Sequence, residues 1–340
     1  MSEDHPSLLD GAIWPPENTK LFGHGDAEAF LAQSYRSGKG HHALLMEGPS
    51  GIGKATLAFR FANHVLSHPD PASAPEFLAD PDPNSSVSRQ ITSGASHNLL
   101  HLARPVDEKT GKVKSAITVD EVRRAGRFFS QTSGTGNWRI VIIDPADDMN
   151  RSAANAILKI LEEPPKRALF LLISHAPGKL LPTIRSRCLP LKLSPLGDEA
   201  LHSALAHLGV EGDPALLASA NGSVGEALKL VNYGGGEIIS AYNEVLSLQG
   251  PSARKAMHRL ADALTGKDND TIFDFFSTHI GDDLMGRAKA AAMAGEVVQA
   301  ERLSRLHSDI MERLTVSDAY NLDRKQTILG ILGDIKQPGP

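Results

Sequence analysis

Short aliphatic runs alternate with amphipathic stretches in the first half of the chain. The runs at residues 43–46, 140–143 and 169–173 are apolar throughout and are bounded by polar or turn-forming residues. Such runs are typical of strands that are buried on both faces of a parallel sheet. Residues 119–129 and 151–161 instead repeat apolar side chains at helical spacing. The alternation predicts an α/β fold with crossover helices.

The second half of the chain has a different pattern. From Asp198 onward strand-like runs are absent, and helical patterns follow one another with Gly, Pro and Asp between them. Three short helices are predicted at residues 198–208, 214–220 and 224–231, and an all-helical region at residues 238–335. The stretch 232–236 between them contains three consecutive glycines, which predicts a linker.

These patterns predict three domains. Residues 1–196 form the α/β domain, residues 197–232 a small three-helix domain, and residues 233–340 a larger helical domain. Within the first domain, residues 68–96 are rich in Pro, Asp, Ala and Ser. We expect this segment to be a surface excursion rather than part of a core.

Composition narrows the class of protein. A chain of 340 residues is long enough for two or three domains with sizeable cores. Its single Cys excludes an internal disulfide and a thiolate-based zinc or iron–sulfur site, and favours a reducing, cytoplasmic compartment. We expect neither a secretory signal nor a membrane span, because no window approaches the roughly 18 apolar residues that a span requires. The formal net charge of −5 argues against a nucleic-acid binder that works alone by bulk charge, so any DNA contact needs a local patch or partner subunits.

A candidate phosphate-binding loop follows the first predicted strand. Gly48, Gly53 and Lys54 have the spacing GxxxxGK, with Gly51 between them, and a helical pattern follows at residues 57–66. Glycines allow successive backbone N–H groups to point at phosphate, the helix N-terminus adds its positive end, and the lysine reaches the outer phosphates. The strand before the loop and the helix after it are the context that this motif requires. The sequence therefore predicts a P-loop backbone.

The catalytic groups that usually accompany such a loop are missing. Ala55 stands where a Ser or Thr hydroxyl would hold Mg²⁺. Thr56 is one position late and points elsewhere, because successive helix residues are about 100° apart. Asp144 is in place for a metal-binding carboxylate, but Pro145 occupies the position of a catalytic Glu and can neither take a proton nor orient a water. We expect a nucleotide-shaped site that hydrolyses nothing, built from Gly48, Gly51, Gly53, Lys54, Thr56 and Asp144.

Residues 144–189 carry a more specific likeness. The string NAILKILEEPP at residues 155–165 and the triplet Ser186-Arg187-Cys188 are its most specific parts, and Leu21–His24, His42–Leu45 and Asn321–Gln326 support it. On these residues the chain resembles the clamp-loader branch of the AAA+ proteins, and within it the delta-prime subunits of bacterial DNA polymerase III. The resemblance spans almost the whole chain.

The resemblance implies a fold and a set of partners. The fold is an α/β AAA+ P-loop core with a parallel sheet, a small helical lid domain and an all-α collar domain, through which subunits form a five-membered arc. The implied partners are clamp-loader ATPase subunits and a delta subunit in a hetero-pentamer, the sliding clamp, and primed DNA reached through the complex. Delta-prime acts as a largely rigid stator in that family. Gly225 stands where ATPase relatives carry an Arg that senses the γ-phosphate, which fits the stator.

Arg187 is the candidate catalytic residue that the resemblance implies. In the family, the Arg of this triplet projects into the ATP site of the neighbouring subunit as an arginine finger. A guanidinium placed there offsets charge that develops on the γ-phosphoryl group. The alternative is an ordinary surface arginine. Arg185 is the weaker candidate, and Cys188 is expected to pack as a small hydrophobe.

Two other groups of residues are weaker candidates. Many delta-prime relatives carry a four-Cys zinc module after the P-loop helix, and this chain lacks it, so no zinc is expected. The pairs His64/His68 and His97/His101 share helical spacing, but two histidines do not make a zinc site. The arginines at 123, 124 and 127 could meet DNA phosphates, or could belong to a solvated face paired with Asp120 and Glu121.

Three functional hypotheses follow. The first is a non-hydrolysing clamp-loader subunit that completes a partner's ATP site, with ATP binding at its own loop left open. The second is an ATP-hydrolysing gamma/tau-type subunit in which Thr56 and Asp147 replace the missing groups. The third is a purely structural adaptor in which Arg187 does nothing chemical.

Overall fold

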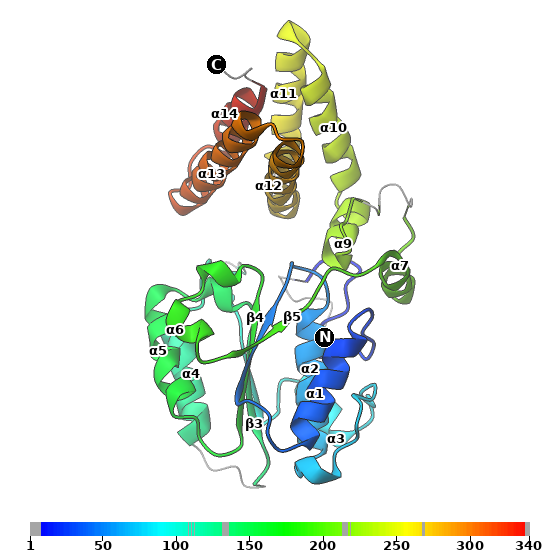
Figure 1. Cartoon of the computed structure of the whole chain (residues 1–340), viewed down its shortest axis with the longest axis vertical. Coiled ribbons are helices and arrows are strands. Elements are labelled where there is room, and N and C mark those ends of the chain that lie inside the picture. Colours follow the sequence, from blue (N-terminus) through cyan, green and yellow to red (C-terminus); the bar gives the residue numbers. More distant parts are fainter. Residues whose placement is uncertain are drawn as a thin grey trace. The chain divides into compact units, whose positions relative to one another are not determined.

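The protein divides into two compact units, residues 1–225 and 226–340. This computed structural model describes residues 8–107, 109, 111, 113–130, 136–212, 217, 219–266 and 269–336. Figure 1 shows the α/β character of the first unit and the all-helical character of the second. The predicted fold class, an α/β core followed by helical regions, is confirmed. The division at 1–196, 197–232 and 233–340 stays a prediction.

A parallel five-stranded sheet forms the centre of the first unit, in the order β2-β3-β4-β1-β5. Three of its strands, β1 (Ala43–Glu47), β3 (Arg139–Ile143) and β4 (Ala168–Ser174), are the predicted apolar runs. The two edge strands, β2 (Leu99–Leu102) and β5 (Leu189–Lys192), were not predicted. Their sequences, LLHL and LPLK, carry a polar residue or a proline, which an edge strand tolerates and a central strand does not.

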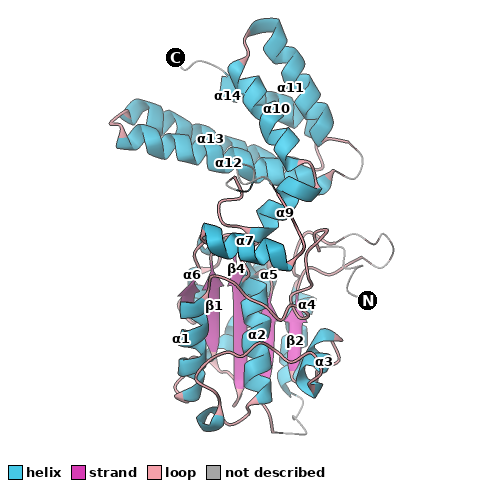
Figure 2. Cartoon of the chain, turned by 90° about the vertical axis from the view of Figure 1, so that its right-hand side faces the viewer, coloured by secondary structure: helices cyan, strands magenta, loops and turns pink. Residues whose placement is uncertain are grey.

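Helices cover both faces of this sheet (Figures 1 and 2). Along each strand, alternate side chains enter different cores: Leu44 and Met46 face one core, Ala43 and Leu45 the other. The helices of the first core are α1 (Gly25–Arg36), α2 (Lys54–Ser67) and α3 (Ser86–Thr92). Those of the second core are α4 (Val119–Ser130), α5 (Arg151–Glu162) and α6 (Pro182–Arg185). The helices therefore bury both faces of the central strands, as their apolar sequences require.

The segment at residues 68–96 is more than a surface excursion, so that expectation is wrong in part. It contains a 3-10 turn (Pro71–Ser73) and α3, and Ala74, Leu78 and Ile91 are buried in the first core. Its anchor is Arg60 of α2, whose buried guanidinium pairs with Asp80 at 2.8 Å and with Glu28 of α1 at 2.8 Å. Its buried apolar residues and the ion pair between Arg60 and Asp80 together fix this polar segment to the first core.

Short elements connect the sheet to the rest of the first unit. Two 3-10 turns, Ala146–Asp148 and Pro177–Lys179, follow β3 and β4. Helix α7 (Asp198–His207) matches the predicted helix at 198–208. Most of the predicted helix at 214–220 lies outside the described residues.

The chain then continues as helices only, among the residues that the structure describes. They are α9 (Val224–Asn232), α10 (Gly235–Ser247), α11 (Gly250–Leu264), α12 (Asp270–Met293), α13 (Val297–Ala319) and α14 (Arg324–Lys336). In the second unit α12 packs along α13, and Lys336 donates to the Val245 and Leu246 carbonyls at the end of α10 at 3.0 and 3.1 Å. A cation at the end of a helix is favourable there.

The expected glycine linker is shorter than predicted. Only Tyr233 and Gly234 separate α9 from α10, and Gly235 is a buried helix residue. A Cβ at Gly235 would lie 3.0 Å from Leu230 Cα and 3.0 Å from Phe275 Cε1. Close packing of the helix therefore explains one of the three glycines. Among the described residues, no helix combines the length and apolarity needed to cross a membrane.

Candidate functional site

The predicted phosphate loop lies between β1 and α2. Gly48, Gly51 and Gly53 have φ angles of +151°, +74° and +102°, which side-chain-bearing residues rarely adopt. A Cβ at Gly48 would lie 2.4 Å from the Leu193 carbonyl oxygen. The glycines are thus required both by the turn and by the closeness of neighbouring backbone, and the loop has the P-loop position at the carboxyl end of a parallel strand.

Lys54 is turned back onto its own loop. Its Nζ donates a hydrogen bond to the Gly48 carbonyl at 2.6 Å and a second to the Pro49 carbonyl. The side chain is buried, and burial lowers the pKa of Lys54 to about 8 against the opposing charges of Asp144 and Asp147. The ammonium group that would bind phosphate in a P-loop here binds two carbonyls of the same loop instead.

Two other segments, residues 223–225 and His24, contact the outside of the same loop. Ser223 Oγ donates to the Ser50 carbonyl at 2.9 Å, and the Gly225 N–H donates to the Gly51 carbonyl at 3.2 Å. His24 Nε2 lies 2.6 Å from the Ile52 carbonyl, so this nitrogen carries the proton and donates. Burial lowers the pKa of His24, which favours the neutral ring. Three successive loop carbonyls are thus held from outside, two by residues 223–225 and one by His24.

Gly225, which the resemblance predicts to stand where ATPase relatives carry a sensor arginine, is part of this contact. A Cβ built on it would lie 3.0 Å from Gly51 Cα, and a Cβ on Gly51 would lie 2.5 Å from Ser223 Oγ. The residues at 223–225 therefore lie backbone to backbone on the phosphate loop. Here a glycine permits a close approach that an arginine would obstruct.

The acidic residues after β3 have separate roles. Asp144 is buried, and burial raises its pKa to about 6, although the Lys54 charge acts in the opposite direction. Asp147 accepts hydrogen bonds from Ser174 Oγ at 2.7 Å, the His175 N–H at 2.5 Å and the Ala176 N–H at 3.2 Å. Both oxygens of Asp147 therefore fix the backbone after β4, a use that sequence reasoning did not identify.

The residues present fit a nucleotide only in part. The loop's backbone has the shape for phosphate, and Lys54 is at its base. Ala55 offers no hydroxyl for Mg²⁺, and Thr56 is a buried residue of α2. The donor set thus suits phosphate oxygens and lacks the usual metal ligand beside the lysine.

Arg187 lies between α6 and β5, with its side chain 33% exposed. Its Nη1 donates to the Thr183 carbonyl at 2.8 Å, and its Nη2 pairs with Glu162 Oε1 at the end of α5. Cys188 next to it is buried in the second core, and burial raises the pKa of its thiol to about 12. The predicted packing role of Cys188 is confirmed. Arg185, on α6, is exposed.

The weaker candidates are not brought together into a site. Among the described residues there is no cluster of three or more potential metal ligands. The His64 and His68 rings lie 5.0 Å apart, and His101 packs on Phe59 at 5.3 Å. Arg123 pairs with Asp120 at 3.0 Å and Arg124 with Glu121 at 2.5 Å, as expected for a solvated helix face.

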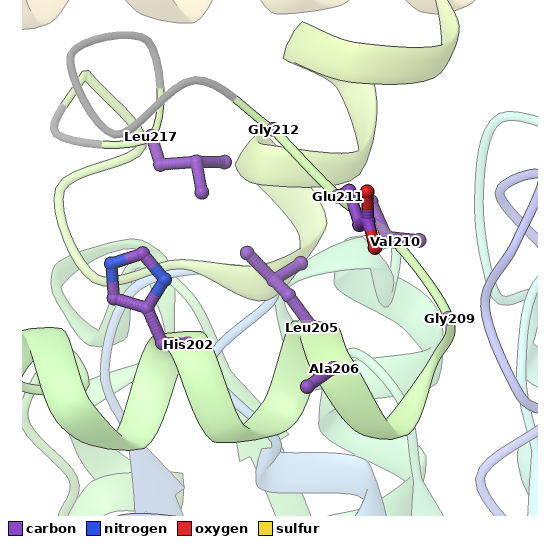
Figure 3. A pocket seen from close by; sticks show the side chains of 8 residues that line it. All are labelled: His202, Leu205, Ala206, Gly209, Val210, Glu211, Gly212 and Leu217. Carbon is purple, nitrogen blue, oxygen red and sulfur yellow. The ribbon is translucent and has the colours of Figure 1, made fainter.

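A separate cavity of about 420 Å³ lies at α7 (Figure 3). It is lined mainly by apolar side chains and glycines, and His202 and Glu211 are the ionisable residues in its wall. A second cavity of about 640 Å³ lies between residues 16–19 and α3. Neither contains a residue of the phosphate loop.

The fold and the loop define the class of this protein: an α/β protein with a P-loop-like backbone and a helical C-terminal region. The family model described as "DNA polymerase III, delta subunit" matches residues 23–197, about half of the chain. The chain belongs to that family, and within it to the delta-prime, clamp-loader branch. The predicted family is confirmed.

The chain is similar to several individual DNA polymerase III subunits. The DNA polymerase III subunit delta-prime of Pseudomonas aeruginosa is 36% identical over 197 residues, 57% of this chain and 56% of that one. The DNA polymerase III subunit tau of Escherichia coli is 26% identical over 314 residues, 89% of this chain and 45% of that one. This chain therefore matches about half the length of these curated relatives. A solved DNA polymerase III gamma subunit-related protein from Thermotoga maritima is 16% identical, with a TM-score of 0.41 over 90% of this chain and 98% of that one.

Proposed function

We propose that this chain is a clamp-loader subunit that does not hydrolyse ATP and that completes the ATP site of a neighbouring ATPase subunit. The observation that carries the proposal is the use of the phosphate loop inside the chain. Lys54 bonds the loop's own carbonyls, and Ser223, Gly225 and His24 hold the loop from outside. A loop fixed in this way joins parts of the chain rigidly, which suits a stator better than a motor.

Arg187 is the group through which the subunit acts on its neighbour. Its guanidinium is partly exposed and its backbone is fixed beside the buried Cys188. Placed against a neighbour's ATP, a fork of N–H donors offsets charge on the transferring phosphoryl group. The partners in this proposal are clamp-loader ATPase subunits and a delta subunit in a hetero-pentamer, together with the sliding clamp and primed DNA.

Reconstitution with the cognate subunits tests the finger. Arg187→Ala should leave assembly intact and lower DNA-stimulated ATP hydrolysis, because the site it completes loses about 10³-fold in rate or more. Arg185→Ala, at an exposed position two residues earlier, is the matched control and should leave the activity unchanged. Unchanged hydrolysis with Arg187→Ala would favour the purely structural adaptor instead.

We further propose that ATP binds this chain's own loop weakly and is not hydrolysed. Binding requires Lys54 to exchange two carbonyl partners for phosphate oxygens, which reduces the net gain. Titration of the isolated chain with a slowly hydrolysed ATP analogue should show weak binding that Lys54→Ala removes and that Mg²⁺ does not strengthen. If Mg²⁺ strengthened the binding of the ATP analogue, the conclusion that the loop lacks a metal ligand at Ala55 would be wrong.

The gamma/tau-type alternative requires Thr56 and Asp147 to replace the missing catalytic groups. Asp147 is an acceptor of three hydrogen bonds after β4, which argues against a second use as metal ligand or base. ATP turnover by the isolated chain that Lys54→Ala abolishes would favour this alternative over the stator.

A further inference from the structure

The Arg187 guanidinium has a partner within its own chain. Its Nη2 is paired with Glu162 Oε1, while Nη1 donates to the Thr183 carbonyl at 2.8 Å and lies 3.4 Å from Ser186 Oγ. The two ends of the fork therefore differ. Nη1 is held by the backbone carbonyl of Thr183, whose position is fixed by the fold. Nη2 is held only by the flexible, charged side chain of Glu162.

The two charged residues are brought together by the core beneath them. Glu162 follows the buried Leu161 at the end of α5, and Arg187 lies next to the buried Cys188. Leu161 and Cys188 belong to the same hydrophobic core, together with Ile184 of α6. Each charged side chain is thus one residue away from a fixed position, so the pairing is a built feature of the fold rather than a chance encounter of two mobile side chains.

The position of Glu162 is locally unfavourable without the arginine. Glu162 is the last residue of α5, and Glu163 follows it, so two carboxylates lie at the negative end of a helix dipole. The positive charge of Arg187 offsets this repulsion. Glu163 has no ion pair in the part of the chain that the structure describes, which makes it a natural control.

The pair is also easily broken. The side chains of Arg187 and Glu162 are 33% and 48% exposed, and ion pairs with this exposure hold weakly in water. A phosphate group carries more negative charge than one carboxylate and accepts a hydrogen bond from the same Nη2 donor. A phosphoryl oxygen that approaches the exposed side of Arg187 can therefore replace Glu162 without disturbing the backbone contact at Thr183.

We propose that Glu162 is a positioning residue that restrains Arg187 until the nucleotide of a neighbouring subunit displaces it. The inference rests on the proposed finger role of Arg187. Glu162 neutralises the guanidinium and occupies the donor that would face phosphate, so hydrolysis at the completed site is suppressed until the subunits close upon one another. The device limits ATP hydrolysis by an assembled complex that has not yet met its clamp and DNA.

The test is ATP hydrolysis by the complex reconstituted from the full-length chain and its cognate subunits, measured without and with clamp and primed DNA. Glu162→Gln keeps the size of the side chain and removes its charge. It should raise kcat of the unstimulated complex by about 2- to 5-fold, the effect expected for a partly exposed ion pair, and leave the stimulated rate unchanged. KM for ATP should stay the same, because closure of the subunits, and not ATP binding to the open complex, brings phosphate to Arg187. Glu163→Gln should change neither rate.

The double variant separates the possible failures. With Arg187→Ala present, Glu162→Gln should have no further effect, because the residue it restrains is absent. If Arg187→Ala lowers hydrolysis and Glu162→Gln leaves the unstimulated rate unchanged or lowers it, Glu162 is no restraint and only this inference is overturned. If Arg187→Ala changes nothing, the finger proposal and the restraint both fall. A rise with Glu162→Gln that persists in the double variant would also overturn the inference.

Discussion

Replacing Gly51 by alanine tests whether the segment at 223–225 really holds the phosphate loop. Gly51 has φ +74°, and a Cβ there would lie 2.5 Å from Ser223 Oγ and 2.8 Å from the Gly225 backbone. The side chain must therefore push the two segments apart. Gly94→Ala is a matched control, because Gly94 has φ +68° and a Cβ there would have nothing within 4 Å.

The expected loss of stability has two parts. The left-handed conformation costs an alanine about 1 to 2 kcal/mol relative to glycine, and this part is common to both variants. Gly51→Ala should also break the bonds from Ser223 to Ser50 and from Gly225 to Gly51, each with a net value of about 1 kcal/mol. We expect a total loss of about 3 kcal/mol for Gly51→Ala and about 1 kcal/mol for Gly94→Ala.

Tryptophan fluorescence during urea unfolding measures this difference. The chain has two tryptophans, Trp14 and Trp138, and both belong to the first unit, so the signal reports the unit that contains the loop. The free energies of unfolding follow from the midpoints and slopes of the transitions. Equal losses for Gly51→Ala and Gly94→Ala would refute the close contact between the loop and residues 223–225.

Three further predictions concern buried ionisable groups of the first unit. Burial raises the pKa of Asp144 to about 6, so the folded state holds this proton more tightly than the unfolded chain. The free energy of unfolding of the native chain, relative to that of Asp144→Asn, should therefore fall by up to about 3 kcal/mol between about pH 4 and about pH 6 and stay constant above about pH 6. Urea titrations that give the same difference between the two proteins at about pH 4 and about pH 6 would contradict this. Arg60→Ala removes the partner of Glu28 and Asp80, should cost about 2 to 3 kcal/mol and should expose residues 68–96 to limited proteolysis, while the exposed Arg89→Ala should do neither. Burial raises the pKa of the Cys188 thiol to about 12, so a thiol reagent at about pH 8 should label the unfolded chain and leave the folded one unlabelled; rapid labelling of the folded chain would show that the thiol is accessible.

The strands that could be predicted from the sequence are those in which consecutive residues are apolar because both faces of the strand are buried. The central strands β1, β3 and β4 lie between other strands, so nearly every residue is apolar and the run is visible in the sequence. The edge strands β2 and β5 contain His101 and Pro190, and their assignment depends on the neighbour that pairs with them. The anchoring of residues 68–96 was likewise hidden, because it depends on Arg60, far from them in the sequence.

The candidate site divides in the same way. The sequence alone determined the phosphate loop and the missing catalytic positions, since the spacing of Gly48, Gly53 and Lys54 and the identities of Ala55 and Pro145 are local facts. Only the tertiary structure decided what those residues do. Lys54 turns to its own loop, the segment at 223–225 lies on Gly51, and Glu162 pairs with Arg187, in each case through groups that strands and helices bring together. A local motif determines which atoms are available, whereas their partners depend on how the chain folds. Lys54 turns back within its own loop, and the other two contacts join segments that are distant in the sequence.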